Sequence, residues 1–164
     1  MKVFKEQQRF TQLWLIVLMA FSIVVPVAII LKEADQMEST ELIIALSVVI
    51  LAPAIIFLFK LTTRMDEKGI YYKFIPFHFK TRCIPWHDIT NAYVRTYDPI
   101  SEYGGWGIKG SNLFNKKRGI AFNVKGDVGI QLELNNGKKI LIGTQLKQQA
   151  QDTLDTYKHK LNNG

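Results

Sequence analysis

Cysteine is almost absent from this 164-residue chain, and histidine is rare. Cys83 is the single cysteine, and the histidines are His78, His87 and His159. A single cysteine cannot form a disulfide bond within the chain, so the fold is not held together by disulfides. Closed zinc sites usually take four Cys or His ligands in paired short spacings, which these residues do not provide. We therefore expect no disulfide framework, no metal and no cofactor.

Charge is missing from two long apolar runs. Leu13–Leu31 contains nineteen uncharged residues and Leu42–Phe59 contains eighteen. At ~1.5 Å per residue, each run would form a helix about as long as the ~30 Å apolar core of a bilayer. Neither run has the polar stripe of a soluble core helix. We predict two membrane-spanning helices, and their lack of ionisable residues disfavours a channel or transporter.

Basic residues flank this pair of runs on one side only. The connecting loop, residues 32–41, has one lysine and four carboxylates, whereas the outer flanks carry Lys2, Lys5, Arg9, Lys60, Arg64 and Lys68. The positive-inside rule therefore predicts that both termini are cytoplasmic and the loop is outside. The first run is longer than the apolar part of a secretory signal, and no small-residue cleavage site follows it.

The net charge of +7 is unevenly distributed. Residues 1–61 carry equal numbers of basic and acidic side chains, so the whole excess lies in residues 62–164. We predict an N-terminal arm with a transmembrane hairpin over 1–61 and a basic cytoplasmic domain over 62–164. An apolar share of 48% argues against a disordered chain.

The second part alternates between short apolar and polar runs, which is typical of strands. An Asn-Gly pair at Asn136-Gly137 predicts a tight hairpin between two of them. We expect six or seven antiparallel strands, at residues 64–66, 70–75, 77–84, 89–97, 120–125, 129–134 and 138–142.

The last segment has the apolar spacing of an amphipathic helix. Thr144 is suited to cap its start. The apolar residues recur every three or four positions, at Leu146, Ala150, Leu154, Tyr157 and Leu161. A single apolar stripe needs a partner, and the open end of a strongly bent sheet would bury it.

This order of strands and helix resembles the pleckstrin-homology-like (PH-like) fold, a bent barrel of strands closed by its last helix. With the hairpin before it, the chain is similar to bacterial PH-domain membrane proteins of largely unknown function. The segments that carry the resemblance are Gly69–Tyr72, Ile84–Ile89, Tyr93–Arg95, Tyr97–Pro99, Glu102–Gly107 and Leu141–Gln145. The resemblance implies a cytoplasmic domain at the bacterial inner membrane.

Phosphoinositide binding does not follow from this resemblance. Members of the fold that bind phosphoinositides have a basic first inter-strand loop, whereas Asp66–Gly69 here is short and acidic. Nucleotide binding is also disfavoured. Gly105–Gly110 matches G-x-G-x-x-G, but no strand-to-helix unit surrounds it, so we interpret these glycines as turn and close-approach positions.

Two polar groups could carry chemistry. His87-Asp88, four residues after Cys83, could form a catalytic pair, although a turn that begins at Trp86 with Asp88 as its cap explains them more simply.

Arg95, Asp98 and Glu102 lie close together in the sequence and could do acid–base work in a pocket. An ion pair that holds the intervening loop is the simpler interpretation. A deep pocket that unites these three side chains with His87 would favour an enzyme.

The densest basic patch is Lys116, Lys117 and Arg118, with Lys109 and Lys125 nearby. Next to an anionic leaflet these side chains could contact lipid headgroups; a solvated face is the alternative, and nothing resembles a nucleic-acid reader. We therefore expect a membrane-anchored, non-catalytic interaction module that binds an unidentified protein partner or the anionic lipid surface. A small structural subunit of a membrane complex and an enzyme remain the alternatives.

Overall fold

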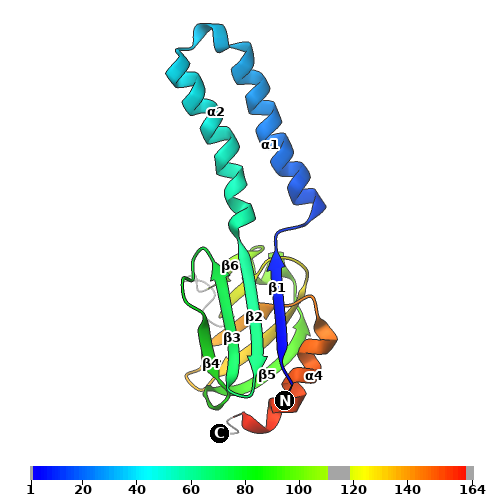
Figure 1. The fold of residues 1–164 in the computed structure, drawn as a ribbon. Coiled ribbons are helices and arrows are strands. Elements are labelled where there is room, and N and C mark those ends of the chain that lie inside the picture. Colours follow the sequence, from blue (N-terminus) through cyan, green and yellow to red (C-terminus); the bar gives the residue numbers. More distant parts are fainter. Residues whose placement is uncertain (1, 111–118, 162–164) are drawn as a thin grey trace. The chain divides into compact units, whose positions relative to one another are not determined.

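The computed structural model describes residues 2–110 and 119–161, and it divides the chain into two compact units (Figure 1). Residues Phe10–Phe59 form one unit, which we call the apolar hairpin. Residues Met1–Arg9 and Lys60–Gly164 form the other, which we call the β-sheet unit. The expected layout of two long apolar helices, then a mainly-β part, then a helix is confirmed.

The apolar hairpin consists of α1 (Leu13–Lys32) and α2 (Ser39–Ala54), with short 3₁₀ turns at Ala34–Gln36 and Ile55–Leu58. Both helical segments, 13–32 and 39–58, are long and apolar enough to cross a membrane. Met19 is the only buried side chain within α1 and α2, both of which are fully described. The two uncharged runs thus form helices over the lengths that the sequence predicted.

The first sheet of the β-sheet unit contains a strand that the sequence analysis did not predict. Its order is β1 (Phe4–Arg9), β2 (Lys60–Asp66), β3 (Gly69–Ile75) and β4 (Arg82–Pro85), all antiparallel. Residues 4–9, which the sequence analysis grouped with the hairpin, therefore belong to the β-sheet unit. Two of the three side chains that β1 buries are polar, so the strand lacks an apolar alternation.

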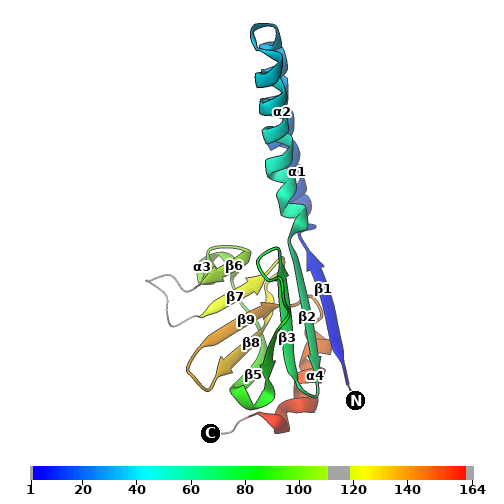
Figure 2. The same cartoon turned by 60° about the vertical axis from the view of Figure 1, so that its left-hand side comes forward.

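The apolar hairpin is inserted between two paired strands. Arg9, the last residue of β1, is the pairing partner of Lys60, the first residue of β2. Both connections to the hairpin therefore leave the β-sheet unit at the same end of its first sheet (Figures 1 and 2).

The second sheet has the order β5 (Ile89–Thr96), β8 (Val128–Leu134), β9 (Lys139–Gly143), β7 (Ile120–Asn123) and β6 (Gly107–Gly110). The predicted β8–β9 hairpin is confirmed: Gly137 has a φ of 76° and its N–H donates to the carbonyl of Leu134 at 2.8 Å. The expectation of a purely antiparallel arrangement is wrong, because β7 and β9 pair in parallel. β8 runs opposite to both β7 and β9, so β9 has the same direction as β7, beside which it lies.

The described residues form nine strands rather than six or seven. The strand expected over 77–84 shortens to β4, because residues 76–81 form a loop that folds back on β3. There the N–H of His78 donates to the carbonyl of Phe74 at 2.8 Å. β6 arises where only turns were expected, although the close approach is confirmed: a Cβ on Gly110 would lie 2.1 Å from the carbonyl oxygen of Gly119.

The core lies between the two sheets, where Tyr72 of β3 meets Phe122 of β7 with ring centroids 4.8 Å apart. Helix α4 (Lys147–Tyr157) packs against β1, β5 and β8 and buries Ala150, Leu154 and Tyr157, three members of the predicted apolar stripe. Leu146 and Leu161, the other two members, lie outside the helix and are only partly buried.

The predicted capping role of Thr144 is wrong, since α4 begins three residues later. Instead, the Thr144 hydroxyl donates to a carboxylate oxygen of Glu6 at 2.6 Å and accepts from the N–H of Leu146 at 3.1 Å. Thr144 therefore ties the β9–α4 connection to β1.

Candidate functional site

The outer edge of β1 is the feature of the β-sheet unit best suited to binding. In the part of the chain that the structure describes, β2 is the only strand that pairs with β1. Alternate residues of an antiparallel strand direct both N–H and C=O to the same side, so half of β1 presents these groups at its outer edge. Such an edge is a template for another extended chain.

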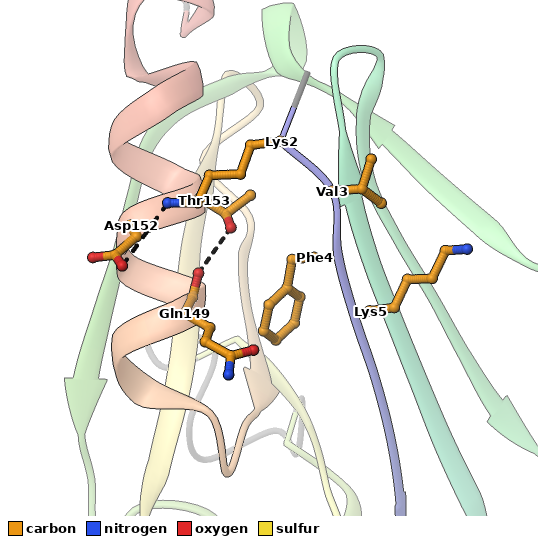
Figure 3. Close-up of a pocket in the computed structure, with 7 residues that line it drawn as sticks. All are labelled: Lys2, Val3, Phe4, Lys5, Gln149, Asp152 and Thr153. Atoms are coloured by element: carbon orange, nitrogen blue, oxygen red, sulfur yellow. Dashed lines mark hydrogen bonds and ion pairs between the residues drawn. The ribbon is translucent and has the colours of Figure 1, made fainter.

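A groove of about 470 Å³ lies between this edge and α4 (Figure 3). It is lined by Lys2, Val3, Phe4, Lys5, Gln149, Asp152 and Thr153. Figure 3 shows the side chains of Lys2 and Phe4 extending toward α4, whereas those of Val3 and Lys5 point to the other side of the chain. Phe4 is 3% exposed. The groove thus combines an apolar floor, polar helix side chains and strand backbone.

Buried polar contacts hold β1 in place. The two carboxylate oxygens of Glu6 accept from the Thr144 hydroxyl at 2.6 Å and from the N–H of Gln145 at 2.8 Å. The Gln8 side-chain amide donates to the carbonyl of Gly143 at 2.7 Å. Because hydrogen bonds to a buried charge are stronger than neutral ones, β1 is a fixed edge.

The surroundings of the groove are basic. The β-sheet unit has twenty Lys and Arg residues and ten Asp and Glu residues. The outward side of β1 carries the exposed side chains of Lys5 and Arg9. Asp152 forms an ion pair with Lys2 at 3.8 Å, and both are nearly half exposed, so this pair contributes little. A segment with acidic side chains would match this edge electrostatically.

Two residues of the predicted basic patch, Lys109 and Lys125, are described. Lys109 of β6 pairs with Ala121, whereas Lys125 follows the other end of β7. Lys116, Lys117 and Arg118 lie outside the described residues. The structure therefore leaves the anionic-surface contact of this patch a prediction.

Arg95 and Glu102 form the predicted ion pair. Their side chains make two parallel hydrogen bonds of 2.8 and 3.1 Å, which raise the pKa of Arg95 above its ordinary value. Arg95 also donates to Tyr103 and Gln131. The charges of this pair are satisfied by each other, so the contact fixes helix α3 (Pro99–Tyr103) against β5.

Asp98 has a local structural role. It caps α3 by accepting from the N–H groups of Ile100 and Ser101 at 2.9 and 3.0 Å. The hydrogen bond from the Ser101 hydroxyl, followed by that from the Ser101 N–H, lowers the pKa of the Asp98 carboxyl.

His87 is not part of the Arg95 cluster. It lies in the 3₁₀ turn Trp86–Asp88, just before β5, whereas Asp98 and Glu102 follow the end of β5. At ~3.3 Å per residue, the eight residues of β5 separate the two groups by roughly 25 Å. His87 and Asp88 are 3.5 Å apart and exposed, as expected for a turn. The four residues of the enzyme hypothesis therefore do not share one pocket.

A second hollow of about 270 Å³ borders this turn, lined by Cys83, Ile84, Asp88, Leu134, Asn135 and Asn136. Among the described residues, no three His, Cys, Asp or Glu side chains are grouped as metal ligands would be. The exposed thiol of Cys83 lies on β4.

No protein-family model matches the chain, and no curated protein matches it either. Sequence reasoning missed the β1 groove because Lys2–Arg9 looks like a charged flank of the first apolar run. No apolar alternation marks the strand, because Glu6 and Gln8, which are buried on the same side as Phe4, are polar.

Proposed function

We propose that the protein is a membrane-anchored, non-catalytic interaction module of the bacterial inner membrane. The order of two apolar helices, a mainly-β part and a last helix supports the proposal, because it matches the layout of the PH-domain membrane proteins that the sequence resembles. The apolar hairpin acts as the anchor, because helices with almost no buried side chain would expose large apolar surfaces to water.

The ligand in this proposal is an extended, acidic segment of a partner protein that adds to the outer edge of β1. The observation that carries it is the unpaired edge beside a groove of about 470 Å³. An added strand gains backbone hydrogen bonds, and its outward side chains face Lys5 and Arg9. Opposite charges directly across strands stabilise the pairing.

A second copy of this chain is a poorer occupant of the edge. Antiparallel pairing of two β1 strands centred on Gln7 would place Lys5 of each copy opposite Arg9 of the other. Like charges directly across strands are destabilising.

The test uses the full chain in lipid nanodiscs and a synthetic peptide of alternating Val and Glu, followed by fluorescence anisotropy. A peptide with Gln in place of Glu is the charge control, and one with a central proline cannot complete the ladder. Lys5→Gln with Arg9→Gln should weaken binding about 2- to 30-fold, from ~0.2–1 kcal/mol per lost pair. Lys138→Gln, in the exposed β8–β9 turn, is the matched control.

Binding that is equal for the acidic and proline peptides would contradict pairing at a strand edge. If the peptide affinity is unchanged in the Lys5→Gln with Arg9→Gln variant but falls in Lys138→Gln, the peptide binds elsewhere. If the protein dimerises as its concentration rises and the dimer loses peptide binding, the β1 edge is occupied by a second copy of the chain.

A further inference from the structure

The loop between β3 and β4 presents two phenylalanines to the solvent. In this segment, Pro76–Thr81, which we call the aromatic loop, Phe77 is 60% exposed and Phe79 is 89% exposed. The other described phenylalanines of the β-sheet unit are buried. Exposed aromatic side chains placed together commonly mark an interaction surface.

A buried histidine holds the loop in its shape. His78, between the two phenylalanines, donates from its backbone N–H to the Phe74 carbonyl at 2.8 Å and accepts at Nδ1 from the Phe74 N–H at 3.2 Å. Its ring packs against Tyr72 and Phe122, with centroids 5.7 and 5.3 Å away. His78 is therefore the buried residue of the loop, and Phe77 beside it also contacts the ring of Phe74, with centroids 6.2 Å apart.

The protonation state of His78 agrees with this anchoring role. Burial, with a smaller contribution from the positive charge of Arg82, lowers the pKa of its imidazole below the ordinary value. The neutral ring keeps Nδ1 available as an acceptor.

The aromatic loop lies at the end of the sheet that leads into the apolar hairpin. Ile75, the last residue of β3, pairs with Lys60, which in turn pairs with Arg9. Figures 1 and 2 both show the β3–β4 connection at the end of the first sheet where β1 finishes and β2 begins. Only Phe59 separates β2 from the preceding 3₁₀ turn.

Basic residues lie near the two phenylalanines, both in the following residues of the chain and on the neighbouring strands. Lys80 and Arg82 follow Phe79 and are exposed, while Lys60 and Lys73 are partly exposed on the neighbouring strands. No acidic residue lies between Gly69 and His87. Aromatic side chains with a rim of Lys and Arg are the composition that binds a bilayer interface, where the rings enter the headgroup region and the cations face anionic lipid.

We propose that the aromatic loop docks on the bilayer, with Phe77 and Phe79 inserted at the boundary between headgroups and acyl chains. The inference rests on the proposed function in one respect: the hairpin must span the membrane. A link of one residue, ~3.5 Å when extended, then keeps this end of the sheet beside the headgroups. The hairpin and the loop give the β-sheet unit separate membrane attachments, which restrict its tilt.

The experiment measures how strongly nitroxide-labelled lipids quench the fluorescence of a label on the protein, in vesicles that contain one-quarter anionic lipid. The full chain carries Cys83→Ser and one fluorescently labelled cysteine. Thr81→Cys reports on the aromatic loop, Glu67→Cys on the opposite end of the same sheet, and Val25→Cys on the middle of α1. We expect a shallow nitroxide to quench the label at residue 81 but not at residue 67, and a deep nitroxide to quench residue 25.

A double variant, Phe77→Ser with Phe79→Ser, should lower the quenching at residue 81, because the label then lies near the headgroups without an inserted loop. Ile100→Ser, which removes another exposed apolar side chain of the β-sheet unit, should leave it unchanged. If residue 25 is quenched while residue 81 is not, the docking inference is overturned and the spanning hairpin stands. If residue 25 is not quenched, both the inference and the proposed anchor fail.

Discussion

Glu6 shows how one side chain can connect distant parts of the chain. Its carboxylate is 8% exposed and accepts from Thr144 and from the backbone of Gln145, nearly 140 residues away. These two bonds join β1 to the connection between β9 and α4. Without them the groove would lose its fixed wall.

We predict that Glu6→Ala destabilises the β-sheet unit by about 2–3 kcal/mol, since hydrogen bonds to charged groups contribute ~1.5–3 kcal/mol and buried donors are left unpaired. Urea unfolding of the detergent-solubilised chain, followed by near-UV circular dichroism, measures the free energy of unfolding. Gln7→Ala, on the exposed side of β1, should change it by less than about 0.5 kcal/mol. An equal effect of both substitutions would show that Glu6 does not hold the strand.

At the scale of elements, the β-sheet unit is formed from two separate stretches of sequence. The hairpin interrupts a strand pair whose Arg9 and Lys60 are direct partners. A two-residue turn suits such a junction in an antiparallel pair. The unit therefore does not need the hairpin in order to close its first sheet.

We predict that replacing residues 10–59 with Asn-Gly gives a water-soluble protein that unfolds cooperatively. A fragment of residues 62–164, the domain expected from the sequence, lacks β1 and should be markedly less stable. Removing Phe4 alone corresponds to a core truncation of about 3–5 kcal/mol, against a typical total of about 5–15 kcal/mol. Thermal unfolding measures the midpoint temperatures of the joined protein and of the fragment, and we expect the lower midpoint for the fragment. A fragment as stable as the joined protein would mean that β1 is dispensable.

At the scale of the whole molecule, charge is divided between the two units. The apolar hairpin carries one Lys against four carboxylates, all within residues 32–41, and the β-sheet unit holds the basic excess. This division is the reason for the expected orientation, with the β-sheet unit in the cytoplasm.

We predict that an impermeant maleimide labels Ser39→Cys in intact cells and does not label Asn136→Cys until the membrane is permeabilised. Both variants carry Cys83→Ser, and both positions are exposed within their units. Labelling of position 136 alone in intact cells would reverse the orientation and place the β-sheet unit outside.

Local patterns in the sequence were enough to predict several elements. The two uncharged runs, the Asn136-Gly137 hairpin and the stripe Ala150–Leu154–Tyr157 each depend on neighbours within a few residues, so periodicity and turn chemistry specify them. The Arg95–Glu102 pair, seven residues apart, was predictable for the same reason.

The membership of β1, the parallel β7–β9 pair and the groove were decided only by the tertiary structure. β1 buries Glu6 and Gln8, which are polar and become favourable inside only because Thr144, Gln145 and Gly143 supply hydrogen bonds. No local sequence pattern predicts these hydrogen-bond partners, because they are brought together by the folding of the sheets. The sequence alone determined what this chain places in helices and hairpins, and long-range pairing determined that β1 lies at an edge of the first sheet.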